Sequence, residues 1–99
     1  MKTLLLVLLC YTLEAQSPVV GERHEFVIAN FRTEGGAVLP QARVVYGTYG
    51  HLNADRNNAV LLPSHYMANF HGYEWLIGAG KALDPSELFL VATELFGNV

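Results

Sequence analysis

The stretch YGTYGHLNADRNNAVLLPSHY, residues Tyr46–Tyr66, decides the fold of this 99-residue chain. It starts within a β-branched and aromatic run, Ala42–Tyr49, which is typical of a strand. The segment Leu52–Asn58 is rich in Asn and Asp, whose side chains bond their own backbone, so it predicts a turn. The short apolar run Ala59–Leu62 is typical of a strand covered on both faces. The stretch therefore predicts two strands and a turn that lead into a Pro-Ser-His loop.

The flanking residues predict two further strands and one helix. His24–Phe31 mixes apolar and polar residues as a first strand does, and Gly35 and Gly36 after it favour a hairpin connection. Tyr73–Ala79 predicts a short helix, and the continuous apolar run Leu88–Ala92 predicts a fourth strand. The last three elements form a βαβ unit, whose two strands should be parallel with a right-handed crossover. The expected fold class is therefore α/β, with an N-terminal β-hairpin followed by a βαβ unit.

Composition and charge exclude several classes of protein. Apolar residues make up 52% of the chain, which indicates a globular protein, and the length suggests at most one domain. The net charge is −3, and the six Lys and Arg residues are scattered, so no nucleic-acid partner is expected. Because Cys10 is the single cysteine, an internal disulfide framework and a cysteine-based zinc site are excluded.

Residues 1–16 are typical of a signal peptide. One Lys precedes the apolar run Leu4–Leu13, which is too short to span a bilayer and has the length of a signal-peptide core. Small and polar residues follow, and cleavage after Ala15 fits them. The alternative is a buried N-terminal helix or strand. We expect a secreted or periplasmic protein without a transmembrane span, in which residues 17–99 form the mature portion.

The serines of the chain do not predict a nucleophile. None of the three lies in the G-x-S-x-G sequence of a nucleophile elbow. Ser64 precedes His65, but neighbours on an extended segment point to opposite sides. Ser64 is therefore expected to bond the local backbone, and we expect no catalytic residue of a triad in this chain.

Three polar side chains raise the alternative of a metal site. His65, His71 and Glu74 form the pattern H-x5-H-x2-E, and His71 and Glu74 would share a face of a helix that begins early. The spacing matches no familiar zinc signature and lacks a further well-placed ligand, so no metal is expected.

Glu94 follows the fourth expected strand directly. It could point into a cleft at the carboxyl ends of the strands, where α/β proteins bind ligands. It could equally be a solvated loop carboxylate, and the sequence leaves both interpretations open.

Several motifs in one order resemble a known family. They are Phe31, Gly36, Leu39–Pro40, the run RVVYGTYGHLNADRNNAVLLP at 43–63, and the run EWLIGAGKALDPSELFLVATELFGN at 74–98. In this order they resemble the opening of the homoserine O-acetyltransferase-like branch of the α/β-hydrolase superfamily. The resemblance covers almost the whole chain after the leader.

The resemblance implies a Ser–Asp–His enzyme that transfers or hydrolyses the acyl group of a small-molecule substrate without a cofactor. In that family one oxyanion-hole N–H comes from the loop after the third strand, which implies the backbone amide of Tyr66 or Met67 here. It also makes His65 and Glu94 possible cleft residues. The family's nucleophile elbow lies after the fifth strand, so we expect a partial sheet that is truncated before the elbow and inactive alone.

The variants PSHY and EWLIG, with LDP and LFGN, resemble the hydrolase-like members more closely than the biosynthetic transferases. Two departures from the transferases also concern the acyl acceptor. His65–Asn69 reads HYMAN where the biosynthetic transferases carry a His-Ala-Leu-Thr-Gly-like run, and Glu94 replaces a common Asn. Both argue against homoserine as the acyl acceptor. The expected leader also argues against homoserine, because acetyl-CoA is cytoplasmic and water is the acyl acceptor available outside the cytoplasm.

The family's strand order begins 1-2-4-3-5, which leaves the third strand with an open edge here. Unpaired backbone groups along an apolar edge favour self-association. The alternative function is a small secreted binding module that reuses the half-sheet and covers this edge with a partner.

Overall fold

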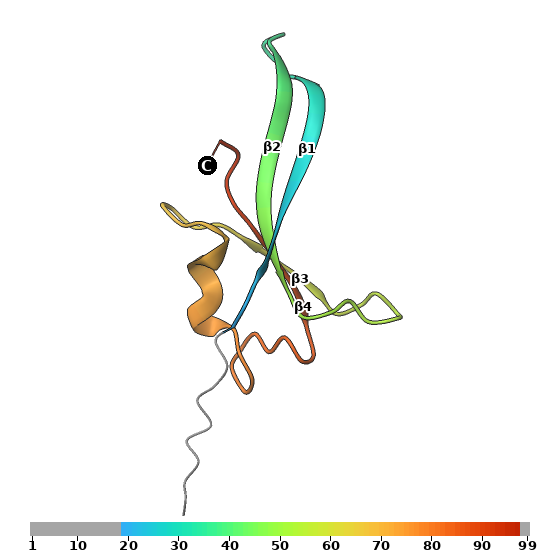
Figure 1. Cartoon of the computed structure of the whole chain (residues 1–99), viewed down its shortest axis with the longest axis vertical. Helices are drawn as coiled ribbons and strands as arrows, with labels where there is room; N and C mark the ends of the chain where they lie inside the picture. The colour runs from blue at the N-terminus through green and yellow to red at the C-terminus, as the bar shows by residue number, and fades with distance from the viewer. Residues whose placement is uncertain (1–18, 98–99) are drawn as a thin grey trace, which may run out of the picture.

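The computed structural model describes residues 19–97. Four strands form one sheet in the order β1-β2-β4-β3. They are β1 (Glu22–Arg32), β2 (Val38–Tyr49), β3 (Ala59–Pro63) and β4 (Phe89–Thr93), and a 3-10 helix, η1 (Phe70–Leu76), connects β3 to β4 (Figure 1). The expected signal peptide and Cys10 lie outside the described residues. No helix between residues 19 and 97 is long and apolar enough to cross a membrane.

The strand pairing confirms the predicted hairpin and βαβ arrangement. β1 and β2 pair antiparallel from Glu22 opposite Thr48 to Arg32 opposite Val38, while β3 and β4 pair in parallel. The hairpin turn is closed by Thr33, whose N–H donates to the carbonyl of Ala37 at 2.9 Å. The hairpin strands are longer than predicted, because backbone pairing continues past the residues with strand-like side chains. This hairpin extends away from the rest of the sheet (Figure 1).

One face of the sheet carries the buried core. Alternate residues of β2 and β4 point to this face, where η1 and the residue after it cover them. The cluster contains Val45, Tyr49, Phe70, Ile77, Leu90 and Ala92. Gly47 lies beneath the ring of Phe70, and a Cβ at this position would come within 2.1 Å of a ring carbon. The missing side chain of Gly47 is therefore what allows Phe70 to seat η1 on the sheet.

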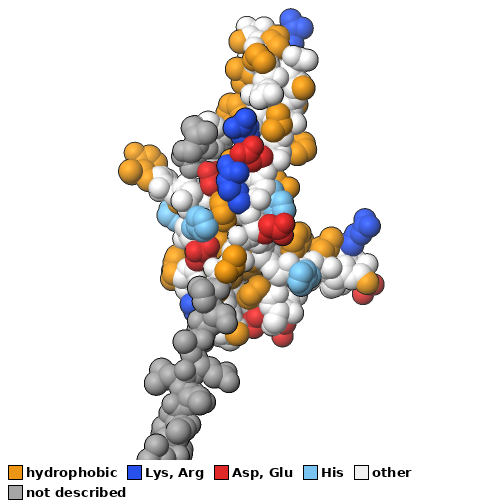
Figure 2. Space-filling view, viewed as in Figure 1, with side chains coloured by type: hydrophobic (Ala, Val, Ile, Leu, Met, Phe, Trp, Pro, Cys, Tyr) orange, Lys and Arg blue, Asp and Glu red, His pale blue; other side chains and the backbone are white. Residues whose placement is uncertain are grey.

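The outer edge and much of the other face of the sheet are exposed within the described residues, although Ala42 on this face is buried. Leu61 of β3 is 64% exposed, so the expectation that β3 is covered on both faces is wrong for residues 19–97. β3 pairs only with β4 in this part of the chain and lies at the edge of the sheet, as the expected strand order requires. Apolar side chains also lie exposed along the hairpin, including Phe26 and Val38 (Figure 2).

The helix begins earlier than predicted and is not α-helical. We expected it at Tyr73–Ala79, whereas η1 starts at Phe70. Asn69 explains the start, because its side chain accepts a hydrogen bond from the N–H of His71 at 2.9 Å and caps the first turn. The helix ends at Leu76, because the backbone of the next residue, Ile77, is extended.

Candidate functional site

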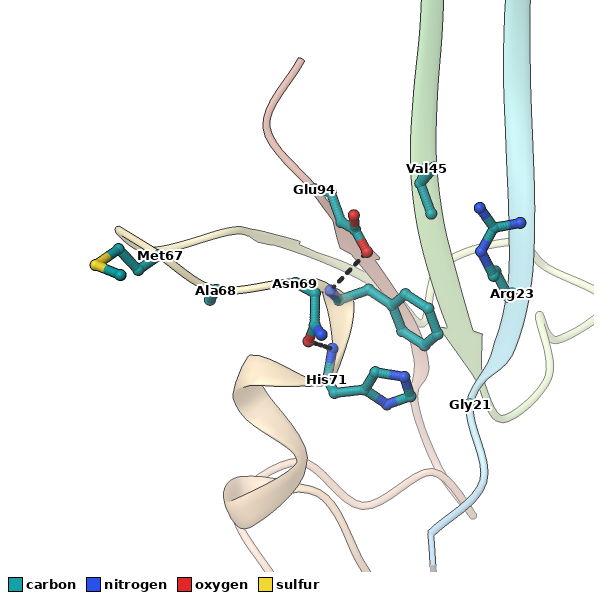
Figure 3. Close-up of a pocket in the computed structure, with 9 residues that line it drawn as sticks. Gly21, Arg23, Val45, Met67, Ala68, Asn69, His71 and Glu94 are labelled. Atoms are coloured by element: carbon teal, nitrogen blue, oxygen red, sulfur yellow. Dashed lines mark hydrogen bonds between the residues drawn. The ribbon is translucent and has the colours of Figure 1, made fainter. Parts of the chain in front are cut away.

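A cavity of about 610 Å³ lies at the carboxyl ends of β3 and β4. Its walls come from the start of β1, from β2, from the loop between β3 and η1, and from the residue that follows β4 (Figure 3). Polar or charged side chains on the wall are those of Arg23, Asn69, His71 and Glu94. This is the place where α/β sheets usually present ligand-binding groups.

The loop after β3 is held by its own polar groups. The hydroxyl of Ser64 donates to the carbonyls of His65 at 3.0 Å and Ala68 at 2.9 Å. The hydroxyl of Tyr73 donates to the carbonyl of Pro63 at 2.5 Å. Ser64 therefore bonds the local backbone as predicted, and its hydroxyl faces no imidazole.

Tyr66 and Met67 form the tip of this loop. The N–H of Ala68 donates to the carbonyl of His65 at 3.1 Å, which closes a turn around the two residues. Met67 has φ +60° and Tyr66 does not have a positive φ, which is the pattern of a type II turn. Within residues 19–97, neither the Tyr66 N–H nor the Met67 N–H has a protein acceptor. Of these two candidate donors, only Met67 lies on the cavity wall.

Glu94, which follows β4, also lies on the wall of the cavity (Figure 3). Its carboxylate accepts a hydrogen bond from the N–H of Phe70 at 3.2 Å, and its own N–H donates to the carbonyl of Val45 at 2.8 Å. Glu94 is thus a cavity-wall residue that ties the end of β4 to the start of η1.

A second polar network joins Tyr49, Glu74 and the cavity-wall residue His71, and the sequence alone did not reveal it. One oxygen of Glu74 accepts from the hydroxyl of Tyr49 at 2.7 Å and lies 2.6 Å from Nδ1 of His71. Tyr49 is only 2% exposed, and burial followed by the Glu74 carboxylate raises the pKa of its hydroxyl above the ordinary value, so the hydroxyl stays neutral. The alternation of Val45, Gly47 and Tyr49 along β2 is the signal that could have placed Tyr49 on the face that η1 covers.

The residues of the metal alternative do not converge. His71 and Glu74 share a face of η1 as expected. His65 turns elsewhere, because its Nδ1 lies 3.2 Å from the carbonyl oxygen of Tyr66 and its Nε2 lies 3.4 Å from that of Gly72. No group of three His, Cys, Asp or Glu side chains in residues 19–97 is arranged to hold a metal ion.

Comparisons with known proteins identify relatives of the chain. No model of a known protein family matches it. It is 32% identical over 91 residues to a homoserine O-acetyltransferase of Chlorobium chlorochromatii, which covers 87% of this chain and 26% of that protein. It is 36% identical over 66 residues to an ethyl acetate hydrolase of Pseudomonas veronii, which covers 66% of this chain and 19% of that protein.

A solved structure of an acetylester hydrolase from Corynebacterium glutamicum shows the same fold. The two superpose with a TM-score of 0.68 and 31% sequence identity over 77% of this chain and 22% of the other. The chain thus spans about a quarter or less of the length of the relatives it matches. Sequence and fold together show that the chain belongs to the homoserine O-acetyltransferase-like branch of the α/β-hydrolase superfamily.

Proposed function

We propose that this chain supplies the opening sheet and the oxyanion side of an acyl-transfer site. Its own serines offer no activated nucleophile, since no G-x-S-x-G sequence occurs and the hydroxyl of Ser64 donates to a backbone carbonyl. The nucleophilic serine and its aspartate and histidine partners would then come from polypeptide beyond these 99 residues. The relatives that match are acyltransferases and esterases, and they favour this function over a small binding module.

The turn at Met67 carries the proposal. A backbone N–H without a protein acceptor, fixed at the end of a strand beside a cavity, can stabilise a developing oxyanion without reorganisation. Met67 meets both conditions within the described residues, because its turn is closed by a hydrogen bond and it lines the cavity. Such donors contribute about 10²–10³ in turnover when one is removed from an acyl-transfer enzyme.

We propose that the substrate is a small ester and that water is the acyl acceptor. Glu94 places a carboxylate on the cavity wall where the family commonly has Asn, and HYMAN replaces the loop of the biosynthetic transferases. The ethyl acetate hydrolase and the acetylester hydrolase among the relatives support the same choice.

A graft tests the choice of acceptor. Residues 19–97 replace the matching segment of the Corynebacterium acetylester hydrolase, and ethyl acetate hydrolysis is compared with acetyl transfer from acetyl-CoA to homoserine. We expect hydrolysis without transfer, and none in a control graft whose nucleophilic serine is changed to alanine. Transfer to homoserine that outpaces hydrolysis would overturn the proposed substrate class. Ester turnover by the 99-residue chain alone would overturn the assignment of the nucleophile to other polypeptide.

We also propose that the chain is exported. The support is the apolar run Leu4–Leu13 with its single preceding Lys, which has the length of a signal-peptide core. Expression with a C-terminal tag, followed by N-terminal sequencing of the secreted or periplasmic product, should give a chain that starts near residue 16 or 17. A product that keeps Met1 and stays in the cytoplasm contradicts export.

A further inference from the structure

The imidazole of His65 is exposed and contacts the loop that carries the candidate oxyanion donor. Its Nδ1 is 3.2 Å from the carbonyl oxygen of Tyr66, and its Nε2 is 3.4 Å from the carbonyl oxygen of Gly72 in η1. The ring of Tyr73 meets it edge-on, with ring centres 5.6 Å apart. The side chain therefore links the tip of the loop to the helix that packs on the sheet.

Gly72 makes room for this arrangement. A Cβ at position 72 would lie 2.9 Å from Nε2 of His65 and 2.9 Å from Cβ of Ala68, closer than real Cβ contacts. Tyr73 is fixed in turn, because its hydroxyl donates to the carbonyl of Pro63 at the end of β3. The ring thus contacts the loop and η1, and Tyr73 of η1 is itself bonded to the end of β3.

The contact with the Tyr66 carbonyl has a direct consequence for Met67. The Tyr66 carbonyl and the Met67 N–H belong to the same peptide unit, and in a trans peptide they point in opposite directions. In a type II turn this central peptide is the unit that flips when the turn changes to type I. A hydrogen bond from Nδ1 to the carbonyl therefore fixes the peptide, with the Met67 N–H directed away from the imidazole.

We propose that His65 is a positioning residue, which holds the Tyr66–Met67 peptide through Nδ1 so that the Met67 N–H stays available to the oxyanion of an ester substrate. The inference rests on the proposed function, because it assigns a role toward the same donor. It concerns the orientation of one peptide, whereas the proposed function concerns the reaction.

The contact with the Tyr66 carbonyl is a hydrogen bond when Nδ1 of His65 carries a proton, because a carbonyl oxygen can only accept. Both ring nitrogens face carbonyl oxygens, which only accept hydrogen bonds, so a neutral imidazole can satisfy one contact and an imidazolium satisfies both. Tyr73 is the titratable side chain that the structure packs against the ring, and within residues 19–97 no carboxylate forms an ion pair with His65. The neutral tautomer that carries its proton on Nδ1 is therefore sufficient to hold the Tyr66–Met67 peptide.

The test is NMR relaxation on the ¹⁵N-labelled full chain at one fixed pH. In the wild type we expect the order parameter of the Met67 amide to lie close to the rigid value of about 0.85. His51→Gln is the matched control, because the His51 side chain is exposed on another loop, and it should leave this behaviour unchanged.

Three substitutions at position 65 separate the two ring nitrogens. His65→Asn places an amide donor near the position of Nδ1, and it should keep Met67 rigid. His65→Gln places the donor near Nε2, and like His65→Ala it should lower the Met67 order parameter below about 0.6. Acetate, added as an oxyanion probe, should shift the Met67 amide resonance in the wild type and in His65→Asn, with about tenfold weaker binding to the other two variants.

A Met67 order parameter that is the same in the wild type and in all three variants would overturn the inference. If a variant fails to fold, the wild type alone decides, because a mobile Met67 amide, with an order parameter below about 0.6, is enough to overturn it. Failure of the proposed function is distinguishable, because the graft would then hydrolyse no ester while the Met67 order parameter still changed in the His65 variants. If the graft hydrolyses ester but the Met67 order parameter does not change in the His65 variants, only the positioning role of His65 is removed.

Discussion

Met67 holds a backbone conformation that its residue type disfavours. At φ +60° it lies in the left-handed region, which costs a residue with a Cβ about 1–2 kcal/mol. Its side chain is 88% exposed and cannot recover this cost by burial. Strain of this kind persists where the surroundings determine the conformation, here through the closed turn and the contact between His65 and the Tyr66 carbonyl. The strain therefore indicates that the backbone conformation of Met67, and not its side chain, is what matters at this position.

Comparison of Met67→Gly with Met67→Ala isolates this strain. Both remove an exposed side chain, but only glycine adopts the left-handed conformation without cost, so Met67→Gly should be more stable than Met67→Ala by about 1 kcal/mol. Urea unfolding of the two variants measures the difference in the free energy of unfolding. Equal stabilities would mean that the turn at Met67 is not left-handed in solution.

Helix η1 is positioned by contacts with the sheet. It is a short 3-10 helix, and such helices have little stability of their own. Phe70 at its first position is 5% exposed and packs where Gly47 leaves space on β2. Glu94 binds the N–H of the same residue from the end of β4. The position of the cavity wall therefore depends on the packing of one aromatic ring.

Gly47→Ala should disturb this packing. The new methyl group would meet the Phe70 ring at 2.1 Å, and overpacking of this kind costs about 1–3 kcal/mol of unfolding free energy. Gly35→Ala is the matched control, because its Cβ would meet nothing closer than 4.0 Å, and it should change stability by less than about 0.5 kcal/mol. Urea unfolding that finds the two variants equally stable would contradict the packing described here.

The turn between η1 and β4 is organised by Asp84. The hydroxyl of Ser86 donates to its carboxylate at 2.7 Å, and the N–H groups of Ser86 and Gly80 donate at 2.9 and 3.2 Å. These bonds, the Ser86 hydroxyl first, lower the pKa of Asp84 below its ordinary value. Because the folded pKa is lower than the unfolded one, the stabilisation is present above about pH 4 and is lost as pH falls through the folded pKa.

Ser86→Ala should raise the pKa of Asp84 part of the way to its ordinary value, since two backbone donors remain. A carboxyl ¹³C titration by NMR measures this directly. Ser64→Ala, in the loop on the other side of η1, should leave the Asp84 titration where it is. An Asp84 pKa that does not move in Ser86→Ala would show that the hydroxyl bond is absent in solution.

At the scale of the whole molecule, the sheet was predictable from the sequence, whereas parts of the cavity were not. Strand-forming runs and turn residues located all four strands, and the family resemblance supplied their order. The start of η1 was missed because it depends on the Asn69 cap and on the seat of Phe70 against Gly47, which is far away in sequence. The partner of Glu74 was missed because Tyr49 looks like any aromatic strand residue until η1 is in place.

The open edge of the sheet predicts self-association of the isolated chain. β3 pairs on one side only within residues 19–97, and Leu61 at this edge is 64% exposed. Leu61→Lys should lower the apparent mass in light scattering coupled to size exclusion, because a charge on an edge strand opposes pairing. Leu52→Lys, at an exposed loop residue, should not. A wild-type chain that stays monomeric at all concentrations would contradict the expectation.

The central claim is that residues 19–97 provide the frame and oxyanion side of an acyl-transfer site. Its most direct test is the rate at which a fluorophosphonate labels the nucleophilic serine of the Corynebacterium graft, since that reaction needs both the serine and the oxyanion donors. We predict labelling within about tenfold of the parent enzyme, because only one donor loop has been exchanged. A graft that is folded by circular dichroism but labels no faster than its serine-to-alanine control would contradict the claim.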